Sequence, residues 1–267
     1  MKALKDPTSP EQGGDAETQR LNRPPDPSVP KRAAQLKAMR QELELFSYSV
    51  SHDFRAPLRH ILGFAEILQA EAGDALDETG RQHLQIIAQS ATRMERMLDA
   101  LLEFSRLGRA EMRHERVSLA MLVEEARQEL HGQIAGREIE WRIGDLPDVQ
   151  GDPARLRQAL VHLLSNAVKF TRSRAPATIE IGAENGGDET VFFIRDNGVG
   201  LDMPHADKLF GLFQRFQRAG EFEGMGVGLA TVRRLMHQHG GRAWAEGIVD
   251  GGATFYLALP NSPEEPV

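Results

Sequence analysis

The sequence contains no cysteine, so it has no disulfide bonds, no thiol chemistry and no zinc site built on cysteine. It also lacks any apolar run near the roughly 20 residues of a membrane-spanning helix. Its polar start, MKALKDPTSPEQGGD, holds no apolar signal-peptide segment. Positive charge is not in excess, and the net charge of −7 argues against a general nucleic-acid-binding protein. We therefore expect a soluble, cytoplasmic protein with no membrane span and no nucleic-acid partner.

The chain divides into a tail and two regions with different sequence patterns. Residues 1–30 carry six of the 14 prolines and no aromatic or β-branched cluster, which predicts a disordered tail or linker. The 267 residues are enough for one large domain or two smaller ones. We place a helical region at 31–110 and a mixed region at 115–262.

The helical region has two apolar stripes at helical spacing. The first is Leu43, Phe46, Val50, Phe54, Pro57, Ile61, Phe64 and Leu68. The second steps by three and four: Leu84, Ile87, Ala91, Met94, Leu98 and Leu101. Two long helices with a short connection predict an antiparallel hairpin. One hairpin alone cannot bury such continuous apolar stripes well. We therefore expect a homodimer in which two hairpins form a four-helix bundle. Pro57 predicts a local kink.

The mixed region alternates helical and strand patterns. Helices are predicted after Ser118, after Asp152 and over TVRRLMHQH, with Ser118 and Asp152 as N-caps. Strands are predicted in REIEWRI, in ATIEIGAENGGDETVFFIRD as a hairpin, and in GRAWAEGIVDGGATFYLALP as a final pair. Adjacent hairpins favour an antiparallel or mixed sheet with helices on one face.

The stretch FSYSVSHDFRAPLR places His52 beside Asp53 on the first helix. At about 100° per residue, His52 lies roughly opposite the apolar stripe, so it is not a buried core histidine. Asp53 is able to accept the Nδ1 proton and leave Nε2 nucleophilic. From this helix alone, a plain surface histidine is the more common interpretation.

Three further motifs suit a nucleotide. Asn166 and Lys169 share a helix face, which suits Mg²⁺ and phosphate, although such pairs are commonly just solvated. In RDNGVGLD, Asp196 is placed to accept a hydrogen bond from an exocyclic amine such as that of adenine. Gly198 and Gly200 there permit close approach of a ligand; an ordinary tight turn fits equally well.

The last motif, EGMGVGLATV, leads Gly224, Gly226 and Gly228 into a helix N-terminus, which is an anion-binding arrangement. The dinucleotide-binding fingerprint is disfavoured, because the strand-to-helix turn and the later acid are missing. The segment KLFGLFQRF between the glycine motifs has the texture of a lid that closes on a nucleotide.

In this order, H-D-x-R-x-P-L, N-A-x-K-F-T, D-N-G-V-G, L-F-x-x-F and G-x-G-V-G-L resemble the transmitter core of a two-component sensor histidine kinase, over about residues 31–260. The texture is most similar to the output modules of bacteriophytochrome-type kinases. The resemblance implies an α + α/β fold: a dimerisation and phosphotransfer hairpin, then an ATP-binding α/β sandwich of the Bergerat type, as in gyrase and Hsp90.

The resemblance also implies a role for each residue. His52 would accept the phosphoryl group and Asp53 would orient it; Asn166 would bind Mg²⁺ and Lys169 would contact phosphate. Asp196 would bind the adenine amine, Gly198 and Gly200 would line the base pocket, and Gly224, Gly226 and Gly228 would border the lid. Arg215 matches the arginine that approaches the γ-phosphate. ATP and Mg²⁺ are the implied cofactors.

The implied activity is ATP-dependent autophosphorylation of His52, followed by transfer to an Asp of a response regulator receiver domain. A nucleotide-binding scaffold with little autokinase activity is the alternative; a gyrase-type clamp does not need the His-Asp helix. No sensor domain precedes residue 31, so we expect input through the helix entering at Lys31, from a separate sensor protein or from a fusion partner.

Two residues depart from the family pattern. His162 stands where many relatives carry a first Asn, which puts the metal geometry or water activation there in question. Ala56 stands where relatives with strong regulator phosphatase activity carry Thr or Asn, so we predict weak phosphatase activity.

Overall fold

The computed structural model describes residues 28–107, 112–214 and 222–261. The chain divides into two compact units, and the boundary between them in the sequence follows Phe46. The described part of the first unit is the beginning of helix α2 (Ser28–Ala72). The tail expected over residues 1–30 lies almost wholly outside the described residues.

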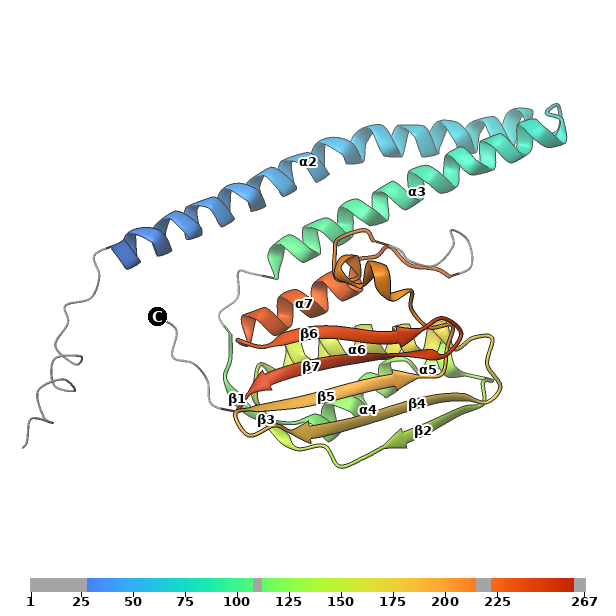
Figure 1. Cartoon of the computed structure of the whole chain (residues 1–267). Coiled ribbons are helices and arrows are strands. Elements are labelled where there is room, and N and C mark those ends of the chain that lie inside the picture. Colours follow the sequence, from blue (N-terminus) through green and yellow to red (C-terminus); the bar gives the residue numbers. More distant parts are fainter. Residues whose placement is uncertain (1–27, 108–111, 215–221, 262–267) are drawn as a thin grey trace, which may run out of the picture. The chain divides into compact units, whose positions relative to one another are not determined.

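The second unit begins with the rest of α2 and with α3 (Glu78–Arg106), which form the expected helical hairpin (Figure 1). Asp77 caps α3 by accepting a hydrogen bond from the Gly80 amide at 2.7 Å. The two helices are joined by an ion pair, with Arg55 Nη2 2.7 Å from Asp99 Oδ1. Pro57 lies inside α2 without ending it.

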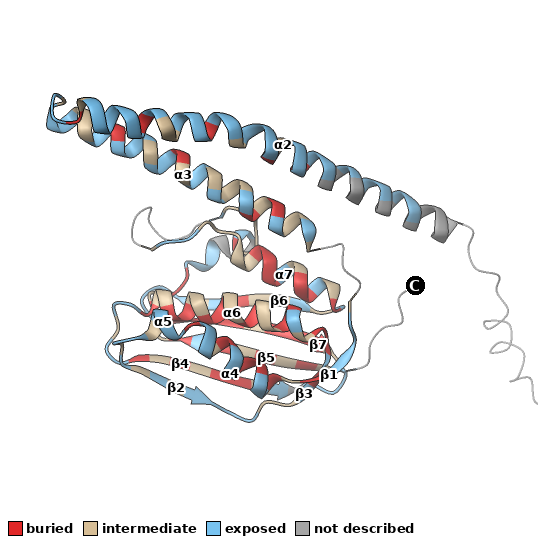
Figure 2. Ribbon diagram, turned by 180° about the vertical axis from the view of Figure 1, so that it is seen from behind, coloured by how far each residue is buried: buried red, intermediate tan, exposed pale blue. Residues whose placement is uncertain are grey.

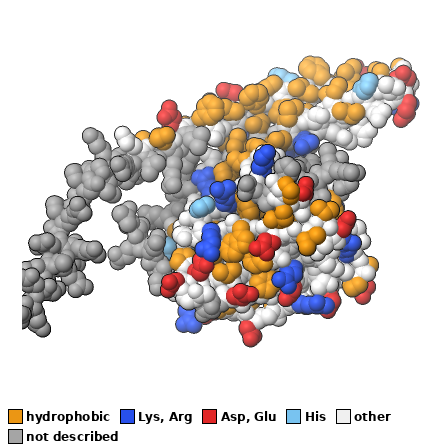
Figure 3. All heavy atoms as spheres, in the orientation of Figure 1, with side chains coloured by type: hydrophobic (Ala, Val, Ile, Leu, Met, Phe, Trp, Pro, Cys, Tyr) orange, Lys and Arg blue, Asp and Glu red, His pale blue; other side chains and the backbone are white. Residues whose placement is uncertain are grey.

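Among the described side chains, the hairpin buries serines, alanines and three leucines, and it leaves the phenylalanines of the apolar stripe of α2 exposed. The buried residues of its two helices are Ser47, Ser51, Leu58, Ala65, Leu84, Ala91, Ala100 and Leu102. By contrast, Phe46, Phe54 and Phe64 are 65%, 56% and 65% exposed. Figure 3 shows apolar side chains gathered along these helices. A single chain therefore leaves the stripe uncovered, and pairing of two hairpins into a four-helix bundle stays a prediction.

The remaining residues form a five-stranded mixed sheet with helices on one face (Figures 1 and 2). In order across the sheet, the strands are β2 (Ile139–Ile143), β4 (Ala177–Asn185), β5 (Glu189–Asp196), β7 (Gly252–Pro260) and β6 (Arg242–Ile248). The first pair is parallel and the other pairs are antiparallel. The helices are α4 (Leu119–Glu129), the short α5 (His131–Ile134), α6 (Pro153–Phe170) and α7 (Gly228–Gln238). With the hairpin, this sheet domain confirms the predicted fold class.

The core lies between the sheet and its helices: β5 alternates buried and more exposed positions, and β7, an inner strand of the sheet, is buried along most of its length. In β5, Phe192 and Ile194 are almost fully buried, and so are Leu160 and Leu164 on α6. The helix starts follow the predicted capping. The hydroxyl of Ser118 accepts from the Met121 amide, and the Asp152 carboxylate accepts from the first amides of α6.

Three short elements were not predicted. Strands β1 (Glu115–Ser118) and β3 (Asp148–Gly151) form a two-stranded antiparallel sheet, and α5 adds one helical turn. Four residues are too few to display a period of two. In that small sheet Val117 pairs with Val149, and both are buried. The short η1 (Met203–Lys208) follows β5. Within the described residues, no helix has both the length and the apolar character needed to cross a membrane.

Candidate functional site

His52 lies on the exposed face of α2, as the helical wheel predicts. Its side chain is 72% exposed, and its Nδ1 lies 3.2 Å from Asp53 Oδ1. The ring also stacks near Tyr48, with centroids 6.4 Å apart. When the ring proton is on Nδ1, that N–H donates to Asp53, and Nε2 carries its lone pair toward solvent. The arrangement presents a nucleophilic nitrogen.

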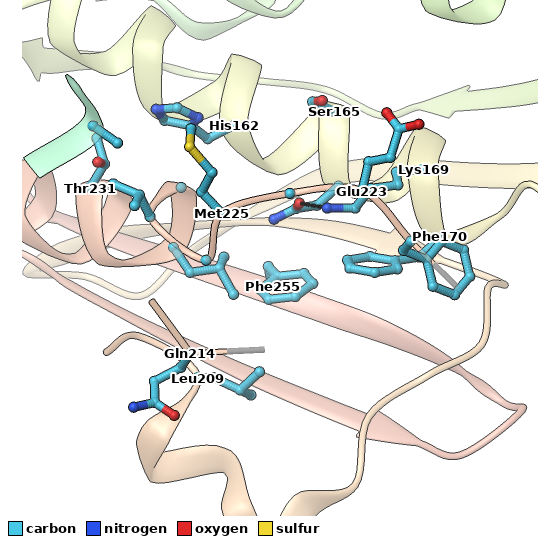
Figure 4. Close-up of a pocket in the computed structure, with 18 of the residues that line it drawn as sticks. His162, Ser165, Lys169, Phe170, Leu209, Gln214, Glu223, Met225, Thr231 and Phe255 are labelled. Carbon is cyan, nitrogen blue, oxygen red and sulfur yellow. Dashed lines mark hydrogen bonds between the residues drawn. The ribbon is translucent and has the colours of Figure 1, made fainter. Parts of the chain in front are cut away.

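Helix α6 contributes Asn166 and Lys169, which contact each other directly. Lys169 Nζ donates a hydrogen bond to Asn166 Oδ1 at 3.0 Å and lies 4.3 Å from the centre of the Phe170 ring (Figure 4). The amide oxygen that would ligate Mg²⁺ therefore contacts a cation already. A metal ion at Asn166 would replace this contact and release the ammonium group toward phosphate.

His162 lies one turn before Asn166 on α6, and the two residues line one cavity together with Lys169 (Figure 4). Burial lowers the pKa of its imidazole. An added Cβ on Gly228 would lie 3.4 Å from His162 Nδ1, so the ring faces the start of α7 closely. The imidazole is therefore a neutral hydrogen-bonding group at the place where the helix begins.

Asp196 ends β5 and is 3% exposed. Its Oδ1 accepts a hydrogen bond from the Gly198 amide at 2.9 Å. Its Oδ2 is buried and has no hydrogen-bond partner among the described residues. Burial raises the pKa of the carboxyl to about 6, against the opposing effect of the backbone amides of Gly198 and Ala253. A buried acceptor without a partner is costly, so a donor from a ligand would be bound strongly here.

Gly198 and Gly200 are at positions that exclude a side chain. A Cβ on Gly198 would lie 2.5 Å from the Phe170 carbonyl oxygen. Gly200 has φ +75°, and a Cβ there would lie 1.8 Å from the Ile248 carbonyl oxygen. These glycines let the loop after β5 pack against the end of α6 and the turn between β6 and β7.

The glycine run before α7 passes across α6. Gly224 and Gly226 have φ +144° and +72°, values that favour glycine. A Cβ on Gly224 would lie 3.4 Å from Lys169 Nζ. Helix α7 begins at Gly228, and Val227 supplies no side-chain cap. Among the described residues no side-chain cap serves the start of α7, and the glycine run that leads into this helix passes Lys169; both features favour an anion.

One cavity brings many of the predicted residues together (Figure 4). Asn166, Lys169, Gly224, Gly226 and Gly228 all line it. Lining residues that the sequence argument missed include Ser165, Phe170, Leu209, Met225, Thr231 and Phe255. Of these, Phe170 follows Lys169 directly within a motif, whereas Phe255 lies in an apolar strand that carries no such signal.

The other predicted residues do not line this cavity. Asp196 is the last residue of β5 and lines a separate cavity with Thr178 and Thr254. Gly198 and Gly200 lie in the loop after β5, and the Val199 amide in that loop donates to the carbonyl oxygen of Phe170, a residue of the first cavity. Arg215 lies outside the described residues, as does part of the expected lid. The lid is described as far as Gln214, and there the Phe213 amide donates to the Gly226 carbonyl at 2.8 Å.

Family models match both parts of the chain. One, "His Kinase A (phospho-acceptor) domain", matches residues 42–110. Another, "Histidine kinase-, DNA gyrase B-, and HSP90-like ATPase", matches residues 151–263. The chain belongs to the two-component sensor histidine kinases. This confirms the resemblance of the sequence motifs to a transmitter core.

Curated relatives are longer proteins. The methanogenesis regulatory histidine kinase FilI of Methanothrix harundinacea is 36% identical over 230 residues, which are 86% of this chain and 26% of FilI. Cyanobacterial phytochrome B of a Nostoc species is 33% identical over 228 residues, 84% of this chain and 30% of the phytochrome. The transmitter core thus spans less than a third of the length of either relative.

Solved structures share the fold. Full-length ShkA in complex with AMPPNP has a TM-score of 0.55 and 28% identity, covering 82% of this chain and 46% of ShkA. The histidine kinase ThkA, solved in complex with the response regulator protein TrrA, has a TM-score of 0.58 and 22% identity. That match covers 88% of this chain and 67% of ThkA.

The residues of the transmitter core fit ATP with a divalent cation. The unpartnered Oδ2 of Asp196 matches an adenine amine, and the uncapped start of α7 matches phosphate. Among the described residues, no group of three or more acidic or histidine side chains forms a metal site. Mg²⁺ commonly binds through one or two protein oxygens together with substrate phosphates. Asn166 is the residue that would hold it.

Proposed function

We propose that this transmitter core is a protein-histidine autokinase that transfers the γ-phosphoryl group of ATP to His52 and then to an aspartate of a response regulator receiver domain. The observation that carries the proposal is the exposed His52–Asp53 pair on a chain that also carries a glycine-lined anion site. Because ATP is the phosphoryl donor inside cells, the proposal places these domains in the cytoplasm.

Each residue of the nucleotide site has a separate task. Asp196 Oδ2 accepts the adenine amine, and the amides at the start of α7 hold the phosphates. Asn166 ligates Mg²⁺, which supplies charge neutralisation when bound. Lys169 leaves Asn166 and contacts phosphate oxygens. Most of the catalytic effect then comes from positioning and charge neutralisation, because the phosphoryl transition state is loose.

The transfer step conserves atoms and charge as follows. The Nε2 lone pair of His52 forms the new N–P bond while the bond from the γ-phosphorus to the bridging oxygen breaks, and the electron pair leaves with ADP. The Nδ1 proton stays on the ring. Asp53 Oδ1, 3.2 Å from Nδ1, stabilises the positive charge that develops on the imidazole.

A second copy of the chain is the proposed partner of the hairpin. The exposed stripe of α2, which includes Phe46, Phe54 and Phe64, is the apolar surface that another hairpin would cover. A homodimer would complete the four-helix bundle and leave His52, on another face of α2, accessible to ATP and to a receiver domain. The input is proposed to come from a separate sensor protein or from a region beyond this chain.

Incubation with γ-labelled ATP and Mg²⁺ tests the proposal. We expect label that is stable to alkali and lost in acid, as for a phosphoramidate. His52→Gln should abolish the label, whereas His60→Gln, at an exposed histidine on the same helix, should retain it. Nucleotide binding without label would favour the scaffold instead, and label that persists in His52→Gln would overturn the assignment of His52.

A further inference from the structure

Arg174, in the loop between α6 and β4, joins two segments that are far apart in sequence. Its Nη2 donates hydrogen bonds to the Gly198 carbonyl at 3.1 Å and to the Asp250 carbonyl at 2.9 Å. The side chain is 33% exposed, and Nη2 lies 3.7 Å from Asp250 Oδ1. The guanidinium group is therefore anchored mainly to backbone oxygens.

These two carbonyls belong to segments that already interlock. The Asp250 amide donates to the Val199 carbonyl at 2.8 Å. Gly200 packs so closely on the Ile248 carbonyl oxygen that no side chain fits between them. Arg174 completes this junction between the loop after β5 and the turn between β6 and β7. These contacts fix the position of the loop after β5 against the turn between β6 and β7.

The position of Gly198 also sets the orientation of Asp196. The Gly198 amide donates to Asp196 Oδ1 at 2.9 Å, and the Gly198 carbonyl accepts from Arg174. Gly198 is thus fixed on both sides. With Oδ1 occupied, the buried Oδ2 is the oxygen left for a ligand. A shift of Gly198 would break its hydrogen bond to Oδ1, and both carboxylate oxygens of Asp196 would then be without that fixed orientation.

We infer that Arg174 is a positioning residue for recognition of the adenine base, acting through Gly198 on Asp196. The inference rests on the proposed nucleotide site. The Nε of Arg174 is buried without an acceptor among the described residues and its carboxylate contact is 3.7 Å long, so its short contacts are the two to the backbone carbonyls, one of which is on Gly198. Recognition of the phosphates, at the other glycine run, should not depend on Arg174.

Calorimetric titration of the full chain with ADP and with inorganic tripolyphosphate, which lacks a base, separates the two parts of the site. Arg174→Met should weaken ADP binding by about tenfold, the usual effect of losing hydrogen bonds to a charged group, and leave tripolyphosphate affinity unchanged. Arg174→Lys keeps the charge and should recover part of the ADP affinity. In autophosphorylation, KM for ATP should rise in Arg174→Met while kcat stays the same.

Arg172→Met, at an exposed arginine of the same loop, is the matched control and should bind both ligands as the wild type does. Unchanged ADP affinity in Arg174→Met, or an equal loss for ADP and tripolyphosphate in both Arg174 variants, would overturn the inference. Failure of the wild type itself to bind ADP would instead refute the proposed nucleotide site.

Discussion

Replacing Asp196 by Asn should make the nucleotide-free protein more stable at neutral pH while removing its specific binding of adenine. The native carboxyl releases its proton near pH 6 because it is buried, and the unfolded chain releases it near pH 3.8. Between these values the native state holds one proton more than the unfolded state. Its stability therefore falls as pH rises, by about 1.4 kcal/mol per pH unit.

Over this interval the wild type should lose about 3 kcal/mol of unfolding free energy that Asp196→Asn does not lose. The contributions of all other titrating groups cancel in the difference between the two proteins. Urea unfolding followed by tryptophan fluorescence measures this difference in unfolding free energy, because Trp141 and Trp244 both lie in the sheet domain. The difference should be small at pH 4 and reach its full size above pH 7.

ADP should reverse the order of stability at pH 7, because the adenine amine gives Oδ2 the donor that it lacks in the free protein. Stability curves of the two proteins that run parallel from pH 4 to pH 8 would refute the argument. They would show that Asp196 is as well solvated in the native state as in the unfolded chain.

Four further predictions concern other parts of the molecule. Burial lowers the pKa of His239, so stability should fall as pH drops below 6.5, and the pH profile of urea unfolding should be flatter in His239→Gln. Asn166→Ala should remove the effect of Mg²⁺ on ADP affinity while adenosine binding, measured by calorimetry, is retained. Gly200→Ala should cost about 1–3 kcal/mol in urea unfolding, because φ is +75° and a carbonyl oxygen fills the space; Gly132→Ala, which meets nothing within 4 Å, is the control. Wild-type protein with ADP should dephosphorylate its phospho-regulator slowly, and Ala56→Thr should accelerate that loss; rapid loss with the wild type would contradict this prediction.

The sequence predicted the elements that have a long period or a marked start. Helix α6 is an example, because Asp152 and Pro153 mark its beginning and its apolar positions recur over 18 residues. It also placed His52 away from the apolar stripe. The strands β1 and β3 were not predicted because each has four residues, and their paired residues are 30 to 36 positions apart in the sequence. Such pairing depends on the tertiary fold and leaves little local signal.

Within the site, the sequence predicted residue types and shared faces but not contacts. Asn166 and Lys169 were expected on one helix face, but the sequence did not predict that the lysine donates a hydrogen bond to Asn166 Oδ1, the oxygen that we propose for Mg²⁺. The role of Asp196 was an even choice between ligand binding and a turn. Its unpartnered Oδ2 favours a ligand, and burial of that atom arises from packing of distant strands. The contacts of Arg174 have the same origin.

Localisation of the phosphoryl group by mass spectrometry, at neutral or alkaline pH throughout, tests the central claim most directly. After incubation with ATP and Mg²⁺, we expect one acid-labile phosphoryl group on the peptide that carries His52, and none after incubation of Asp196→Asn at the same ATP concentration. Phosphate on a serine, threonine or other histidine, or an unmodified chain that nevertheless binds ATP, would contradict it.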